Sequence, residues 1–136
     1  MKALSIKPGY AMLIVSGLKT IECRSWKTNY RGDILICSTV KKEKGTIPSH
    51  ALGIVTLKDV VPFKKSHFKA AYMEPFDYFD DLFAWKLTNP RLIKPIPVKG
   101  KLSLWEYNGE VEIMDFDTDE DEEKFVQKYW DPLIIQ

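Results

Sequence analysis

The sequence has few of the features that mark several classes of protein. Its 136 residues include only two cysteines, Cys23 and Cys37, and these lack the CxxC spacing typical of zinc and redox motifs. No apolar run reaches the roughly 18 residues that a membrane-spanning helix needs, and the N-terminal residues become polar too soon for a signal peptide. We therefore expect a cytoplasmic chain with no membrane segment and two reduced thiols in its core.

Familiar catalytic signatures are also missing. The sequence contains no P-loop, dinucleotide fingerprint, nucleophile elbow or HExxH motif, and neither His50 nor His67 has an evident cysteine or serine partner. The acidic run after residue 114 fails as a calcium-binding loop, because Glu120 stands where glycine is needed and Val126 where a bidentate glutamate is needed. We expect no cofactor and no metal site.

The near-neutral net charge of +1 conceals two regions of opposite sign. Residues 1–114 contain 18 Lys and Arg against 11 Asp and Glu, whereas residues 115–136 contain 2 against 8. A basic body is compatible with a polyanionic partner, but lysine-rich loops are also ordinary solvated surface. The polar loop 41–49, with lysines at its start, either closes over a pocket or stays in solvent.

Short apolar runs bounded by Gly, Pro or Asn predict that strands dominate the fold. We expect strands at 3–7, 19–24, 33–40, 51–60, 82–88 with a continuation through 91–93, and 110–115. We expect helices at 8–16, about 62–72 and 119–130, the last with Thr118 as its N-cap. Gly32 and Asp33 predict a tight turn between the second and third strands. Pro90, Pro95 and Pro97 confine their strand to an edge or a bulge.

The segment 16–26 is the most informative stretch, because it gathers Lys19, Glu22 and Arg24 on a turn that enters a strand. Strand periodicity places Glu22 and Arg24 on one face. One interpretation is an exposed salt bridge that contributes about 0–1 kcal/mol. The other is a recognition pocket, with Glu22 as acceptor, Arg24 as a planar donor fork and Lys19 as a mobile cation.

The spacing Gly17-x-Lys19-x-x-Glu22-x-Arg24, after a short helix and before the run 30–36, resembles the ASCH domain. That family belongs to the PUA-like barrels, and the similarity in element order extends from about Ala3 to about Trp105. The resemblance implies an α+β fold, a small PUA-like bent β-barrel flanked by short helices. We expect one such domain over residues 1–136, with an acidic C-terminal helix at about 116–136.

The resemblance implies a module that binds RNA or a modified nucleobase or nucleoside. Its ligand-binding set would be Lys19, Glu22, Arg24, Ser25 and Trp26. Trp26 is chosen as a stacking wall because it follows Arg24 in a polar stretch where a large ring has little to pack against.

The resemblance also implies an alternative, since some ASCH proteins are amidohydrolases that deacylate N4-acetylcytidine and others are ribonucleases. Lys19 would then activate the attacking group, and Glu22 stands where the amidohydrolases have a threonine. Glu22 would orient water or the substrate amide. The negative charge of Glu22, however, favours protonated Lys19 and works against a free-amine base. We therefore rank binding above catalysis.

Overall fold

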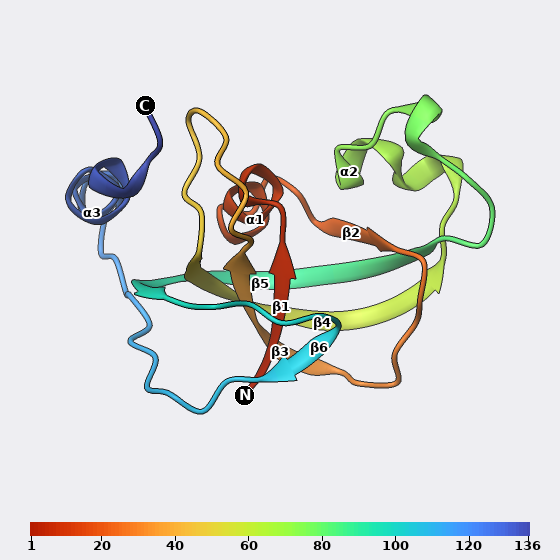
Figure 1. The fold of residues 1–136 in the computed structure, drawn as a ribbon, viewed down its shortest axis with the longest axis horizontal. Coiled ribbons are helices and arrows are strands. Elements are labelled where there is room, and N and C mark those ends of the chain that lie inside the picture. Colours follow the sequence, from red (N-terminus) through yellow and green to blue (C-terminus); the bar gives the residue numbers. More distant parts are fainter.

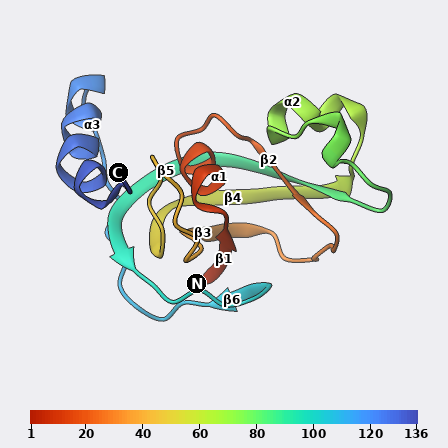
Figure 2. The same ribbon diagram turned by 45° about the horizontal axis from the view of Figure 1, so that its top comes forward.

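The computed structural model describes residues 1–136 as a curled six-stranded sheet that forms half of a barrel, with short helices around it (Figure 1). The strands lie in the order β2-β5-β4-β3-β1-β6. In chain order they are β1 (Lys2–Ile6), β2 (Ile21–Arg24), β3 (Gly32–Ser38), β4 (His50–Pro62), β5 (Phe83–Pro97) and β6 (Leu104–Glu106). The long strands β4 and β5 bend along their length and give the sheet its curl (Figure 2).

Helices α1 (Pro8–Val15) and α2 (Phe68–Ala71) lie on the same side of the long strands, and α3 (Asp119–Phe125) lies beyond one end of them (Figure 1). Helix α3 is continued by a π-helical turn, Val126–Trp130. Three short 3₁₀ turns complete the set, Lys65–His67, Pro75–Asp77 and Asp131–Leu133. Helix α2 lies close to β2, whereas α3 lies at the opposite end of the molecule (Figure 1). None of these helices is both long enough and apolar enough to cross a membrane.

Helix α1 begins and ends where the sequence predicts and packs on the central strands. Pro8 occupies the first helical turn, and Gly17 follows the helix with φ of +82°, a conformation that costs glycine little. The helix approaches β4 closely at Gly53, where an added Cβ would lie 2.6 Å from Val15 Cγ1. The face of α1 that includes Ile14 and Val15 is thereby buried in the main core.

The predicted tight turn at Gly32 is wrong. Strands β2 and β3 are not neighbours, because β2 pairs antiparallel with β5 and β3 pairs with β4 and, in parallel, with β1. Gly32 and Asp33 instead form the first part of β3. A short strand followed by Gly-Asp has the local pattern of a hairpin, but pairing with the distant β5 takes precedence.

Strand β5 joins the two predicted segments 82–88 and 91–93 into one, and its prolines lie as expected. β2 pairs with β5 only over the first part, ending at Lys86, so Pro90 lies beyond the paired stretch. The register with β4 shifts three times, one of these shifts falling between Ile54 and Thr56. The predicted strand 110–115 is wrong, because it is reduced to a single bridge between Ile93 and Ile113.

Two further segments differ from the prediction. The expected helix 62–72 starts late, because β4 continues to Pro62 and only one turn of α-helix forms at α2. Strand β6 was not expected from the sequence; it has three residues and pairs with β1 through Trp105 opposite Ala3. A strand this short carries almost no periodic signal, so long-range pairing alone defines it.

The C-terminal helix forms as predicted over its first half. Thr118 caps it, since its hydroxyl accepts a hydrogen bond from the Asp121 amide at 3.1 Å. Phe125 and Trp130 are buried in the main core, so this acidic segment is anchored through its apolar residues. Further on, Ile135 pairs with the loop before β4: its carbonyl accepts from the Gly45 amide at 2.7 Å and its amide donates to the Thr46 carbonyl at 2.9 Å.

Candidate functional site

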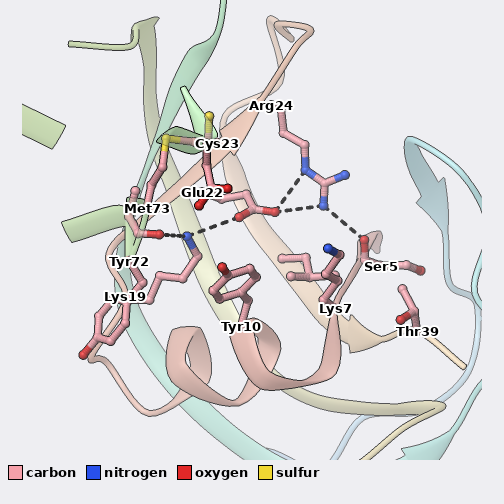
Figure 3. A pocket seen from close by; sticks show the side chains of 13 residues that line it. Ser5, Lys7, Tyr10, Lys19, Glu22, Cys23, Arg24, Thr39, Tyr72 and Met73 are labelled. Carbon is pink, nitrogen blue, oxygen red and sulfur yellow. Dashed lines mark hydrogen bonds and ion pairs between the residues drawn. The ribbon is translucent and has the colours of Figure 1, made fainter. Parts of the chain in front are cut away.

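One cavity of about 470 Å³ lies where the end of β1, the start of α1, strand β2 and the end of α2 meet. Thirteen residues line it, and Lys19, Glu22 and Arg24 are among them (Figure 3). The turn at Gly17 directs the chain from α1 into β2 and brings Lys19 to the cavity. The three charged side chains that the sequence singles out therefore come together at one cavity.

Lys19 is almost completely buried, with 3% of its surface exposed. Its ammonium donates to the Ile21 carbonyl at 2.7 Å and to the Ala71 carbonyl at the end of α2. Its Nζ also lies 3.4 Å from Glu22 Oε1 and 5.0 Å from the centre of the Tyr10 ring. An ammonium has three N–H donors, and here three acceptors surround it. Lys19 is thus a fixed cation and not the mobile one that we expected.

Glu22 lies between Lys19 and Arg24 (Figure 3). Arg24 Nε donates to Glu22 Oε2 at 3.1 Å, and Arg24 Nη2 lies 2.9 Å from the same oxygen. Arg24 Nη2 also donates to the Ser5 carbonyl at 3.1 Å, which joins β2 to β1 across the cavity. Arg24 Nη1 makes no hydrogen bond within the chain. Arg24, which lines the cavity, therefore keeps one pair of N–H donors free, while both oxygens of Glu22 already have a cationic partner.

Burial changes the proton affinity of two groups at this site. Burial lowers the pKa of Lys19 below its ordinary value, although the negative charge of Glu22 acts in the opposite direction. Burial, followed by the same carboxylate, raises the pKa of the Cys23 thiol. Cys23 therefore stays protonated near neutral pH and is a poor nucleophile, although it lines the cavity beside Glu22.

Apolar and aromatic side chains complete the walls. Tyr10 comes from α1, and Tyr72 and Met73 follow the end of α2 (Figure 3). Tyr72 caps α2 in the left-handed conformation, with φ of +53°, and 44% of its surface is exposed. Tyr10 is 38% exposed. These two rings give the cavity accessible aromatic surface on both the α1 and the α2 side.

Ser25 and Trp26 do not line this cavity. Trp26 packs edge-on against Trp85, with ring centres 4.7 Å apart, and its carbonyl accepts a hydrogen bond from the Trp85 indole at 3.2 Å. The expectation that Trp26 forms a wall of the same pocket was wrong in this respect. The pairing of β2 with β5 brings Trp85 to this polar stretch, and Trp85 is the apolar partner that the local sequence lacks.

Other lining residues were missed because they come from distant parts of the chain. Ser5 contributes only its carbonyl to Arg24, and a backbone acceptor has no sequence signature. Tyr10 belongs to a helix whose apolar residues all read as core, and Tyr72 follows a helix that was placed with the wrong start. Tyr72 gave no sequence signal, because its left-handed conformation is uncommon for a bulky residue and is set by the surrounding structure.

A family model described as "ASCH domain" matches residues 4–97, well over half of the chain. The chain belongs to the ASCH domain family. Human "Activating signal cointegrator 1" is 27% identical over 132 residues, a match that covers 79% of this chain. The chain spans only about a fifth of that relative's length, since the match covers 22% of it.

Solved structures of ASCH proteins share the fold. The ASCH protein of Zymomonas mobilis superposes with a TM-score of 0.65 at 20% identity, covering 93% of each chain. A point mutant of the same protein gives a TM-score of 0.64 at 19% identity, covering 93% of this chain and 94% of that one. The α+β, PUA-like bent barrel with flanking short helices is therefore confirmed.

Proposed function

We propose that this ASCH domain binds RNA, or a modified nucleobase or nucleoside, by receiving a base in the cavity at Lys19, Glu22 and Arg24. The supporting observation is that two cations hold the carboxylate of Glu22 in place, while Nη1 of Arg24, on the edge of the guanidinium away from that carboxylate, stays free. The site therefore offers an acceptor at Glu22 and a separate pair of donors at Arg24. A base carries amino groups as well as ring nitrogens or carbonyls, so it can engage each of them.

The dimensions and walls of the cavity support this proposal. Its volume of about 470 Å³ falls within the range of sites that hold small organic ligands. Unpaired bases are recognised by stacking on aromatic rings together with hydrogen bonds to their edges. Tyr10 and Tyr72 supply the rings, the role expected of Trp26 from the sequence. Glu22 and Arg24 supply the contacts to the base edge.

The proposal is tested by calorimetry with cytidine, N4-acetylcytidine, the other common nucleosides and a single-stranded RNA of mixed sequence. Arg24→Gln removes the donor fork, and we expect it to weaken binding of the best ligand at least about tenfold. Arg31→Gln is the matched control, because Arg31 is exposed and bonds only to nearby carbonyls and Asp59. If the wild-type chain binds none of these ligands, or if both variants weaken binding equally, the proposal fails.

A second candidate is a small hydrolase that acts on nucleosides or RNA through Lys19 and Glu22. The observation in its favour is the burial that lowers the pKa of Lys19, because a base or nucleophile needs an accessible neutral amine. Against it stand the carbonyls of Ile21 and Ala71, which occupy the ammonium donors and favour the charged form. Chromatography of N4-acetylcytidine and RNA after incubation decides, since release of product that Lys19→Met abolishes would establish turnover.

A further inference from the structure

A second groove adjoins the cavity at the start of α1. Its volume is about 340 Å³, and it is lined by Lys7, Gly9, Tyr10, Leu13, Lys41 and Glu43. Lys7 and Tyr10 line both the groove and the cavity. Thr39 in the cavity and Lys41 in the groove come from the same loop after β3. The cavity and the groove therefore share a wall at Lys7 and Tyr10.

The groove carries positive charge on both of its sides. Lys7 stands on the α1 side and Lys41 on the loop side, and Lys42 and Lys44 flank the single acidic residue, Glu43. Glu43 pairs with Lys41 at 3.6 Å, but both side chains are about half exposed. Exposed pairs of this kind contribute little, so a phosphate replaces the contact to Lys41 at small cost.

The opposite rim of the cavity has the reverse charge. The segment after Tyr72 contains four carboxylates and no Lys or Arg, namely Glu74, Asp77, Asp80 and Asp81. Asp77 lines the cavity itself. A polyanion is repelled on this side and attracted on the side of Lys7. The two rims thus define a direction in which a phosphate backbone leaves the cavity.

We propose that the groove at Lys7, Tyr10 and Lys41 holds the phosphate that adjoins a base seated in the cavity, which makes the preferred ligand a single-stranded polynucleotide and not a free nucleoside. This inference rests on the proposed function of the cavity. Single-stranded nucleic acids bind where a basic groove follows the backbone next to aromatic rings on which the bases stack. Cavity and groove together supply both parts.

The test compares ligands that differ in their phosphates. The probes are the nucleoside that binds best, its 5′- and 3′-monophosphates, and RNA and DNA single strands of roughly ten nucleotides that contain it. Lys7→Gln combined with Lys41→Gln is the test variant. Lys64→Gln combined with Lys65→Gln is the matched control, because these lysines lie before and in the 3₁₀ turn that precedes α2 and line neither cavity nor groove.

We expect wild-type affinity to rise by at least about tenfold from nucleoside to RNA strand, and the Lys7 and Lys41 variant to bind nucleoside and strand with similar affinity. The salt dependence of strand binding should fall by about one phosphate contact in this variant, and the control should keep the wild-type values. Equal losses in both double variants would overturn the inference. So would a monophosphate that binds as tightly as the strand, which would indicate a free nucleotide as ligand.

The outcome for the groove is separable from the outcome for the cavity. If Arg24→Gln weakens nucleoside binding while Lys7→Gln with Lys41→Gln changes nothing, the groove inference alone fails. If Arg24→Gln has no effect on any probe, the proposed function fails as well. Equal binding of RNA and DNA strands supports recognition through phosphate, whereas a strand preference lost in the lysine variant would place a 2′-hydroxyl contact in the groove and overturn the phosphate assignment.

Discussion

Arg24 with Glu22 and Arg91 with Asp33 are two arginine–carboxylate pairs on the same sheet, and each has a third partner. Glu22 has Lys19, and Asp33 has the Thr56 hydroxyl at 2.8 Å. The Asp33 side chain is 49% exposed, against 9% for Glu22. The same ionic contact therefore exists once in solvent and once at the wall of a cavity.

The two arginines differ in what they leave free. Arg91 uses all three nitrogens, because Nε bonds to the Asn89 carbonyl and Nη1 and Nη2 bond to the two oxygens of Asp33. Arg24 uses Nε and Nη2 only. An arginine whose three nitrogens are all engaged ties β3 to β5, whereas one with a free nitrogen beside a cavity is available to a ligand. This difference, and not the presence of an ion pair, is the physical argument for function at Arg24.

Removing the carboxylate should give the largest difference in stability loss between the two pairs. Glu22→Ala leaves Lys19 buried without its counter-charge, and we expect a loss of about 3 kcal/mol in the free energy of unfolding. Asp33→Ala removes an exposed carboxylate, leaves the half-buried Arg91 its bonds to Asn89 and Thr56, and should cost no more than about 1 kcal/mol. Urea denaturation followed by tryptophan fluorescence measures both. Glu22→Gln serves as the control that keeps an acceptor. Similar losses at Glu22 and Asp33 would mean that burial of the first pair has no energetic consequence.

Removing the third partner, Lys19 in one pair and Thr56 in the other, should also destabilise the buried pair more, but by a smaller margin. Lys19→Met leaves the carbonyls of Ile21 and Ala71 without a donor, and buried unpaired groups cost about 1–3 kcal/mol. Thr56→Val removes one hydroxyl from the exposed cluster and should cost about 0.5–1 kcal/mol. Thermal unfolding of both variants checks this. A Lys19→Met variant as stable as wild type would show that the ammonium is not a structural element, which would strengthen the hydrolase alternative.

Lowering the pH should remove the small contribution that the pair of Asp33 and Arg91 makes to stability. Hydrogen bonds from Arg91 hold the pKa of Asp33 below its ordinary value of 3.8. A carboxyl whose folded pKa is depressed contributes stability above the unfolded pKa and loses it as pH falls through the folded pKa. The stability difference between wild type and Asp33→Asn should therefore be constant above about pH 5 and shrink below pH 3.8. A difference that stays constant down to pH 2 would contradict the Arg91 contact.

The sequence predicted the parts of the site that are local in the chain. Lys19, Glu22 and Arg24 lie on one turn and one short strand, so strand periodicity was enough to bring them together. Their assignment as ligand-binding residues stays a prediction. Tyr72 depends on where α2 ends beside β2, and local sequence does not determine that placement.

The errors in the fold have the same cause. The turn at Gly32 and the strand at 110–115 were inferred from local patterns; pairing of β2 with β5 overruled the first, and the second finds only a single bridge to a distant strand. Trp26 was chosen because its neighbours in sequence are polar, yet its partner Trp85 lies on another strand. Helix α1 was placed correctly because proline, glycine and the apolar residues between them all lie within one short segment.

The backbone pairing of Ile135 with Gly45 and Thr46 couples the loop before β4 to the C-terminal segment, although the two are remote in sequence. The amides of Gly45 and Ile135 are both engaged in it, so exchange of either hydrogen with solvent requires the loop and the C-terminal segment to separate. Phe125 and Trp130 anchor that segment in the core. The free energy that protects the loop, and with it the position of Lys41, is therefore set in part by apolar contacts of residues near the C-terminal end of the chain.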